Sequence, residues 1–327
     1  MTIVILSAGT RNLLVRFFKE SGFNVIATDC DRCAPALYYA DSYYIMPRIT
    51  ESGYIDRVID ICLQNKADAV LPLFEEELTL IAENRRAFTD AGITPVISPY
   101  ESVLLCKDKW QFYTKMKEAH VPVLKTFCGL KDIKSALDEN AISLPAFMKP
   151  RYGAGSVDSH IVAKKELCLS ICEEQNEEML LQELADGDEY GVDVYVDLIS
   201  HKMVSAFIKK KLRMRAGETE KSLSVKDEAL FSLVRKVVES LDMAGPLDID
   251  VFGKDGRFFI SEINPRFGGG YPHAYLCGIN FPKLILNNLN GKENPDITGC
   301  YEEGTVAMKI QDIILLPEDQ TDRNKMR

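Results

Sequence analysis

The sequence contains no uninterrupted apolar run of about 18 residues, the length that a helix needs to cross a bilayer. It also shows no basic N-terminal segment followed by an apolar run, which is the pattern of a secretory leader. Nine cysteines in 327 residues are too sparse for a disulfide scaffold. We therefore expect a cytoplasmic protein with free thiols, including Cys30 and Cys33, whose metal-like spacing has no second pair nearby.

Positive charge is also scarce, because 39 Lys and Arg residues face 49 Asp and Glu residues and leave a net charge of −10. This balance disfavours nucleic acid and anionic membranes as partners. The four histidines are scattered, and no Ser/His/Asp or Cys/His arrangement stands out. Only His273, beside a glycine run, is a candidate site residue among them.

What the sequence does contain begins with apolar strands that alternate with helices. The strands are expected at residues 2–6, 24–28, 69–73 and 93–97. This alternation predicts a parallel sheet covered on both faces, in an α/β domain of residues 1–99. Its first turn holds one glycine, Gly9, which disfavours dinucleotide binding, while a small anion beside Arg11 and an ordinary turn both remain open.

After residue 99, short strands that alternate apolar and polar residues outnumber the helices. This pattern predicts antiparallel sheets of the α+β class. We expect one lobe over residues 100–185 and a second over residues 186–316, followed by a frayed tail at residues 317–327.

The strongest motif is a predicted hairpin around the turn at residues 253–256. The oxygen-bearing side chains that flank this turn are Asp248, Asp250, Glu262 and Asn264. A three-residue turn would place Glu262 opposite Asp248. Strand alternation would keep Asp250 and Asn264 on the same face. Hard oxygen ligands without nearby His or Cys suit Mg²⁺ that is shared with a nucleotide.

A solvated strand face is the alternative interpretation of these acids. It is disfavoured because Arg266 and the three glycines at residues 268–270 follow the second strand at once.

Two lysines precede this hairpin in the chain. Lys149 ends a predicted strand, and the glycine-containing loop after it could fold its N–H groups over polyphosphate. No Gly-Lys-Ser/Thr of a Walker A loop is present, so an ordinary hairpin with a solvated lysine also fits. Lys109 enters a helix about forty residues earlier and carries little information alone.

A strand edge and a basic run complete the candidate features. The edge at residues 182–185 could offer a carbonyl and an N–H to adenine, and Glu189 could bind ribose hydroxyls. Five cations lie within residues 209–215, just after a predicted strand, and Arg215 is singled out as one that could neutralise a transferring phosphate. Surface acids and a solvated loop are the alternatives.

In this order and spacing, the motifs resemble those of the ATP-grasp superfamily, in particular the carbamoyl-phosphate synthase large subunit and biotin carboxylase. The resemblance implies a Rossmann-like N-terminal domain followed by a two-lobed ATP-grasp fold with antiparallel sheets. It implies ATP contacts at Lys109, Lys149, Gly153, Gly155, Ser156, Glu183, Leu184, Ala185 and Glu189. It further implies metal ligands at Asp250, Glu262 and Asn264, and a catalytic role for Arg266. Arg215 of the basic run is a second candidate catalytic residue.

This sequence departs from the family pattern in two places. The first metal carboxylate is the aspartate Asp250 rather than Glu or Gln, and residues 267–273 replace an arginine-serine segment. Substrate identity therefore stays open.

The function implied by the resemblance is an ATP-dependent carboxylate-amine ligase that uses Mg²⁺, or Mn²⁺, and small-molecule substrates. The alternatives are phosphorylation of bicarbonate or carbamate, and a regulatory protein that binds ATP without ligation. A homo-oligomer is compatible with the sequence, which leaves the oligomeric state open. Strand ends of the N-terminal domain are expected to contact the acceptor, at Ser7, Arg11, Asp29, Glu75 and Ser98.

Overall fold

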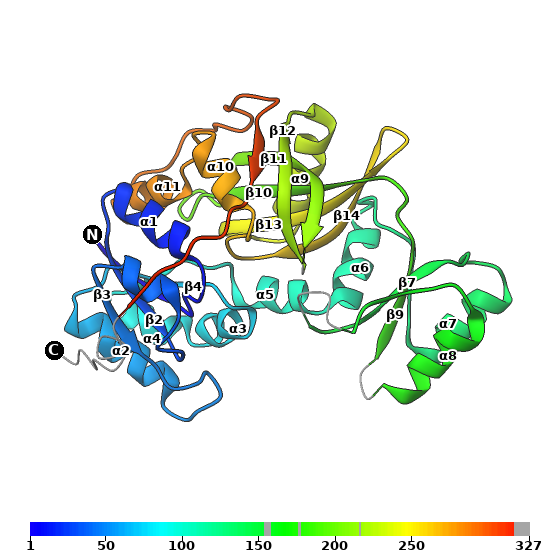
Figure 1. Cartoon of the computed structure of the whole chain (residues 1–327), viewed down its shortest axis with the longest axis horizontal. Coiled ribbons are helices and arrows are strands. Elements are labelled where there is room, and N and C mark those ends of the chain that lie inside the picture. The colour runs from blue at the N-terminus through cyan, green and yellow to red at the C-terminus, as the bar shows by residue number, and fades with distance from the viewer. Residues whose placement is uncertain (154–157, 176–177, 216, 317–327) are drawn as a thin grey trace.

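The computed structural model describes residues 1–153, 158–175, 178–215 and 217–316. These residues form three sheets, each accompanied by its own helices (Figure 1). One sheet is parallel and the other two are antiparallel, as the sequence predicts, so the expected fold class is confirmed.

The N-terminal sheet is parallel and has the order β3-β2-β1-β4-β5. Its strands are β1 (Thr2–Leu6), β2 (Asn24–Asp29), β3 (Ser42–Ile45), β4 (Ala69–Pro72) and β5 (Thr94–Pro95). Its helices are α1 (Asn12–Glu20), the 3-10 helix η1 (Pro35–Tyr39), α2 (Tyr54–Gln64), α3 (Glu75–Glu83) and α4 (Arg85–Asp90). Because the strands are parallel, the turns that follow β1 and β4 share one edge of the sheet.

The small sheet is antiparallel and has the order β6-β9-β7-β8. Its strands are β6 (Thr126–Cys128), β7 (Ala146–Pro150), β8 (His160–Val162) and β9 (Met179–Glu183). Helices α7 (Gly129–Asp138) and α8 (Lys165–Glu174) pack against it through a core that includes Ile133, Met148 and Cys168. Helices α5 (Tyr100–Lys107) and α6 (Lys109–Glu118) connect it to the N-terminal domain (Figure 1).

The large sheet is antiparallel and has the order β14-β13-β10-β11-β12-β15. Its strands are β10 (Asp188–Val196), β11 (Met203–Arg215), β12 (Glu218–Val225), β13 (Gly245–Lys254), β14 (Arg257–Asn264) and β15 (Val306–Met308). Its helices are α9 (Glu228–Ser240), α10 (Tyr271–Leu276) and α11 (Phe281–Leu289). The basic run at residues 209–215 lies inside β11, so its predicted placement after the strand is wrong.

The hairpin of β13 and β14 has the predicted partners on one face but a different register. Its turn has two residues, Asp255 and Gly256, both with positive φ (51° and 71°), as Asp-Gly turns favour. The pairing shifts beyond Val251 and Ile260, where Ser261 is an extra residue in β14. Asp250 therefore faces Glu262, and Asp248 faces Asn264, which corrects the predicted pairing of Glu262 with Asp248.

The predicted boundaries at 99/100 and 185/186 fall between elements of successive sheets, and they stay predictions. After β15, residues 309–316 extend toward the N-terminal sheet in the view of Figure 1. The predicted tail at residues 317–327 lies outside the described residues. Within the described ranges, the structure has no helix that is long and apolar enough to cross a membrane.

Candidate functional site

A cavity of about 710 Å³ lies where the three parts of the chain meet, within the size range of ligand pockets. The predicted site residues that line it are Lys109, Lys149, Gly153, Glu183, Leu184, Ala185, Glu189, Asp250, Glu262, Asn264 and Arg266. Gly155 and Ser156 lie outside the described residues. The N-terminal domain contributes Arg11 and Glu75 to the lining.

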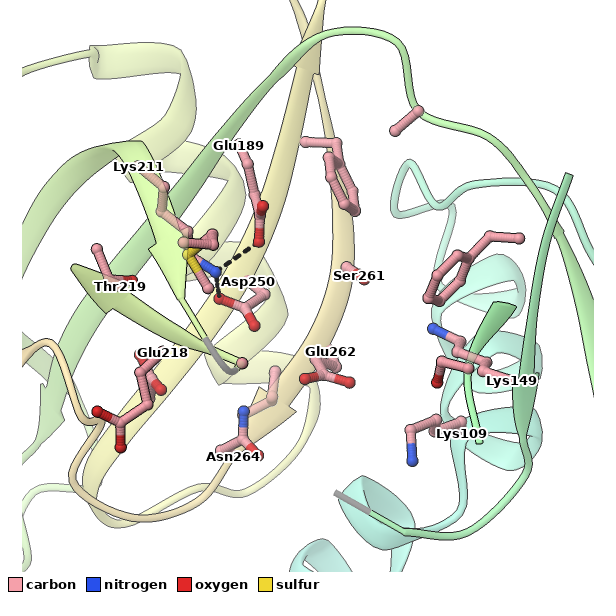
Figure 2. A pocket seen from close by; sticks show the side chains of 18 of the residues that line it. Lys109, Lys149, Glu189, Lys211, Glu218, Thr219, Asp250, Ser261, Glu262 and Asn264 are labelled. Atoms are coloured by element: carbon pink, nitrogen blue, oxygen red, sulfur yellow. Dashed lines mark hydrogen bonds and ion pairs between the residues drawn. The ribbon is translucent and has the colours of Figure 1, made fainter. Parts of the chain in front are cut away.

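One wall of the cavity carries the acids of the β13–β14 hairpin. The Asp250 carboxylate accepts a hydrogen bond from Lys211 Nζ at 2.7 Å, and Glu189 accepts another from the same ammonium at 2.6 Å (Figure 2). Burial raises the pKa of Asp250 to about 7; the Lys211 ammonium opposes this rise, while the carboxylates of Asp248 and Glu262 add to it. This wall therefore has more negative charge than its single lysine neutralises, and it favours an additional cation.

The residues of this wall fit Mg²⁺. Asp250 and Glu262 offer carboxylate oxygens, and Asn264 adds an amide oxygen on the same strand as Glu262 (Figure 2). In the part of the chain that the structure describes, no three His, Cys, Asp or Glu side chains are grouped to hold a metal ion. A bound ion would thus need further oxygens from water or a ligand, which is how Mg²⁺ is commonly held beside phosphates.

The opposite wall carries two lysines. Lys149 on β7 is buried, and its Nζ lies 3.3 Å from the side-chain oxygen of Gln182. Burial lowers the pKa of Lys149, and the ammonium of Lys109 acts in the same direction, whereas Glu262 and Asp250 oppose it. Lys109 donates a hydrogen bond to the carbonyl of Gly153 in the glycine loop. Figure 2 shows both lysines across the cavity from Glu262.

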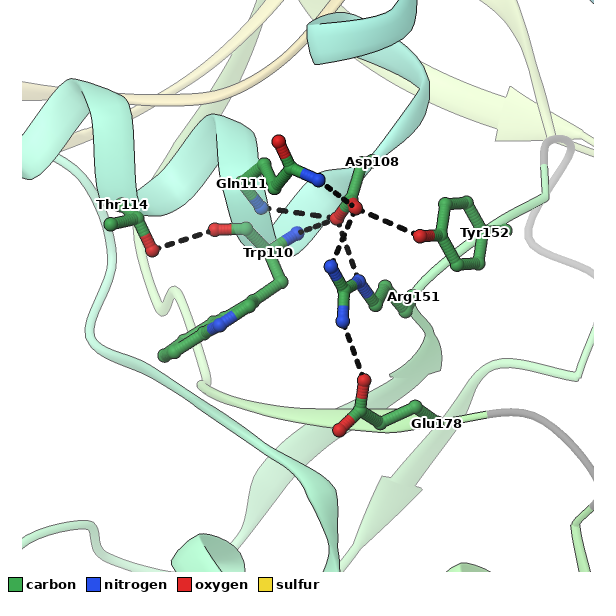
Figure 3. Close-up of polar contacts among 7 residues, drawn as sticks. All are labelled: Asp108, Trp110, Gln111, Thr114, Arg151, Tyr152 and Glu178. Carbon is green, nitrogen blue, oxygen red and sulfur yellow. Dashed lines mark hydrogen bonds and ion pairs between the residues drawn. The ribbon is translucent and has the colours of Figure 1, made fainter.

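Asp108 fixes the position of Lys109, the first residue of α6. Its carboxylate accepts hydrogen bonds from the N–H groups of Trp110 (3.1 Å) and Gln111 (3.0 Å), which cap the helix (Figure 3). It also accepts hydrogen bonds from Arg151 at 2.6 and 2.8 Å and from Tyr152 at 2.8 Å. Through these hydrogen bonds, Asp108 joins α6 to the beginning of the glycine loop.

These hydrogen bonds also determine the charge of Asp108. Burial alone would raise the pKa of its carboxyl group, but the hydrogen bonds from Arg151, the Gln111 N–H and Tyr152 outweigh burial and lower it to about 2. Sequence reasoning assigned no role to Asp108, although an aspartate before a helical segment is a recognised capping signal.

At the predicted adenine-binding end of the cavity, one predicted ligand already has a hydrogen-bond partner within the protein. The Glu183 carboxylate accepts a hydrogen bond from the backbone N–H of Lys125 at 2.8 Å, so it already has a partner. The surrounding lining is apolar and includes Leu124, Phe147, Ile161, Leu184, Met214 and Phe252. An apolar slot bounded by the backbone of residues 183–185 has the character of a site for a flat ring.

Arg266 lies at the end of β14, beside the acidic wall. Its guanidinium donates to the Phe267 carbonyl (2.9 Å) and to the Asn264 side-chain oxygen (3.3 Å). The carboxylate of Asp248 is 3.8 Å away. Arg266 therefore lies next to the predicted metal ligands.

Arg215 and His273 do not line the cavity. Two register shifts between Lys211 and Met214 change the alternation of β11, so Met214 faces the cavity and the Arg215 side chain is 67% exposed, 3.6 Å from Glu220. His273 is buried, with Nδ1 2.8 Å from the Ser222 hydroxyl. Within the basic run, Lys209 and Lys211 line the cavity, and Lys211 is the one that bonds to Asp250 and Glu189. Sequence reasoning singled out neither lysine.

Comparison with known proteins identifies the family. A family model described as an ATP-grasp domain matches residues 106–270, and one described as a PylC-like N-terminal domain matches residues 3–97. The chain belongs to the ATP-grasp family. The resemblance noted in the sequence is thereby confirmed.

Individual relatives of the ATP-grasp chain are distant. A carbamoyl phosphate synthase large chain from Pseudothermotoga lettingae is 23% identical over an alignment 296 residues long, which covers 84% of this chain and 26% of that protein. The chain thus spans about a quarter of that relative's length.

Two solved structures share the ATP-grasp fold. The biotin carboxylase domain of Hydrogenobacter thermophilus 2-oxoglutarate carboxylase, in complex with MgADP, ADP and bicarbonate, matches with a TM-score of 0.75 at 17% identity, covering 93% of this chain and 73% of that one. An N5-carboxyaminoimidazole synthetase from Staphylococcus aureus matches with a TM-score of 0.72 at 15% identity, covering 94% and 79%.

Both departures from the ATP-grasp pattern lie at the cavity. Asp250 occupies the acidic wall despite its shorter side chain. The segment at residues 267–273 contributes Gly269 and Gly270 to the lining. The roles of the individual residues stay predictions.

Proposed function

We propose that this chain is an ATP-dependent ligase that activates a carboxylate as an acyl phosphate and joins it to an amine. The observation that carries the proposal is the arrangement of Asp250, Glu262 and Asn264 opposite Lys109 and Lys149 across one cavity. An acidic wall that can hold a divalent cation and a facing pair of ammonium groups together suit a triphosphate.

Each part of the cavity has a role in this proposal. Lys109 and Lys149 bind ATP phosphates, and Gly153 lies beside them through its hydrogen bond with Lys109. The ATP contacts expected at Gly155 and Ser156 stay predictions. The main chain at residues 183–185 binds adenine, and Glu189 binds ribose. Asp250, Glu262 and Asn264 hold Mg²⁺, or Mn²⁺, which supplies charge neutralisation on the phosphates when bound.

The reaction needs little covalent chemistry from the protein. A carboxylate oxygen attacks the γ-phosphorus of ATP, the bond to the bridging oxygen breaks, and ADP leaves. The amine nitrogen then attacks the acyl carbon, the C–O bond breaks, inorganic phosphate leaves with the electron pair, and the nitrogen loses a proton to solvent. Arg266, beside Asn264, orients the anionic groups of both steps.

A second candidate is the phosphorylation of bicarbonate or carbamate. The similarity to carbamoyl phosphate synthase large chains over 84% of this chain favours it. In that case ammonia takes the place of a larger amine, and the same cavity holds the nucleotide.

Phosphate release from Mg-ATP tests the proposal. The wild-type chain is incubated with pools of carboxylic acids and amines, separately and together, beside Glu262→Gln and the exposed control Glu239→Gln. Release that requires both pools and is lost in E262Q but kept in E239Q supports ligation. Release with bicarbonate and ammonia alone supports the second candidate. If a non-hydrolysable ATP analogue stabilises the wild type while no pool combination releases phosphate, the ligase proposal is wrong and the chain binds ATP without ligation.

A further inference from the structure

The glycine run after Arg266 gives room to charged side chains from other parts of the chain. A Cβ atom on Gly268 would lie 2.4 Å from the Asp248 carboxyl carbon. A Cβ on Gly269 would lie 3.2 Å from Arg11 Nη1 and 3.4 Å from Glu218 Oε1. Arg11, Asp248 and Glu218 therefore converge on the main chain of this run, at the end of the cavity that faces the N-terminal domain.

The turn after β1 aims Arg11 into this end. The Gly9 N–H donates to the Asp29 carboxylate at 2.8 Å, and the Arg11 N–H donates to the Ala8 carbonyl at 2.9 Å. Gly9 has a positive φ of 51°, which makes the tight turn. The base of the Arg11 side chain is thus held by β1 and β2.

The Arg11 guanidinium has no hydrogen bond or ion pair with the described residues. Burial and the neighbouring guanidinium of Arg266 lower its pKa, while the carboxylates of Glu218 and Asp248 act on it through space. The two nearest acids have other partners, since Glu218 lies 2.7 Å from Lys309 and Asp248 lies 3.8 Å from Arg266. A cation in a cavity without a bonded counter-ion favours an anionic ligand.

The other strand-end residues expected to contact the acceptor lie differently. The Ser7 hydroxyl donates to Glu77, the Asp29 carboxylate caps the first turn, and the Ser98 hydroxyl donates to the Ala244 carbonyl. Arg11 and Glu75 alone among the five line the cavity. Arg11 is therefore the cation, among these five residues, that the N-terminal domain places at this end of the cavity.

We propose that Arg11 binds the carboxylate of an amino acid that serves as one of the two substrates, on the floor made by Gly268 and Gly269. The charges favour this class over other anions. Arg11 and Arg266 lie near the carboxylates of Asp248 and Glu218, so a dianionic phosphate would be repelled by two carboxylates, whereas the ammonium of a zwitterion would be attracted to them. This inference rests on the proposed function, because it names one substrate of that ligase.

Binding can be measured without turnover, which separates this inference from the ligase proposal. The probe is a pool of the twenty common amino acids, compared with a matched pool of their α-carboxamides and with a pool of simple carboxylic acids. Each pool is added to the full chain saturated with magnesium and a non-hydrolysable ATP analogue, and the thermal midpoint is followed with pool concentration. The variants are Arg11→Gln and Gly269→Ala, with Arg16→Gln on α1 as control, whose exposed side chain pairs with Glu20.

The wild type and R16Q are expected to be stabilised by amino acids and not by the other two pools. R11Q should weaken this effect about 10- to 100-fold, the loss of one charged hydrogen-bonding group, while keeping its response to the ATP analogue. G269A should also weaken it, because the added methyl group displaces the guanidinium without removing its charge. The inference would be overturned if amino acids stabilised R11Q as much as the wild type. It would also be overturned if either of the other two pools stabilised the wild type as much as amino acids do. A response to the ATP analogue in R11Q shows that the variant is folded.

Discussion

The ammonium of Lys211 lies 2.7 Å from the carboxylate of Asp250, and the same nitrogen lies 2.6 Å from Glu189. One cation thus joins the predicted metal-binding acid to the predicted ribose-binding acid. Because Lys211 is almost fully buried, both acids depend on it for charge balance.

Lys211→Gln should lower the free energy of unfolding by about 3 kcal/mol, since removing one member of a buried ion pair leaves the other without a partner. Mg²⁺ without nucleotide should then stabilise the variant more than the wild type. Urea denaturation with and without Mg²⁺ measures both effects. Lys210→Gln is the matched control, because Lys210 is adjacent in β11 and pairs with the exposed Asp188. Equal stability of K211Q and K210Q would contradict the prediction.

Asp108→Asn should destabilise the chain by about 2–3 kcal/mol, because it weakens charge-assisted hydrogen bonds to Arg151 and the cap of α6. The pKa of Asp108 is lowered to about 2, so its stabilisation is present above the unfolded-state pKa and is lost as the pH falls from about 4 to about 2. Denaturant unfolding across this pH range should show a shallower acid dependence in D108N. Asp132→Asn, at an exposed acid, serves as the control. If the unfolding free energy of D108N fell with pH as steeply as that of the wild type, Asp108 would not be the source of this acid dependence.

His273 should make the fold sensitive to mild acid. Burial, together with the neighbouring Lys209 ammonium, lowers its pKa to about 4. The unfolded chain therefore binds a proton that the folded chain does not, so stability is lost as the pH falls from about 6.5 toward 4, by on the order of 1–3 kcal/mol. Replacing His273 with Asn should reduce the pH dependence of the unfolding free energy over this range, whereas His160→Asn at an exposed position should leave it unchanged. Parallel pH curves for wild type and H273N would rule this out.

Lys149→Met should weaken binding of a non-hydrolysable ATP analogue on the order of 10- to 100-fold, the loss of one charged hydrogen bond. The nonpolar replacement matches the length of the buried stem, so the fold should persist. Titration calorimetry gives the dissociation constant, and Lys164→Met at an exposed position is the control. Unaltered affinity in K149M would remove this lysine from the proposed phosphate site.

Local patterns predicted the fold class and the residues of the acidic wall. Strand and helix periods depend on neighbouring residues, and the motif around Glu262 and Asn264 is contiguous in sequence. The pairing was wrong for two reasons: the turn has two residues rather than three, and Ser261 is an extra residue in β14 that no sequence signal marks. The two-residue turn at Asp255 and Gly256 and this bulge together restore Asp250 and Glu262 to one face.

Contacts between distant segments could not be predicted. The alternation of the basic run changes between Lys211 and Met214, so a strict two-residue period misplaces Arg215. The convergence of Arg11 with Asp248 depends on how the N-terminal domain packs against the large sheet, which a single sequence does not encode locally.

The glycine run implies a rule for how this region can evolve. Each of its glycines lies against a charged side chain from another element: Gly268 against Asp248, Gly269 against Arg11 and also Glu218, and Gly270 against Lys209. A larger residue at one of these positions would collide with its partner unless that partner became shorter. Homologous chains should therefore show paired changes at 248 and 268, at 11 and 269, and at 209 and 270, with each pair drifting independently of the other two.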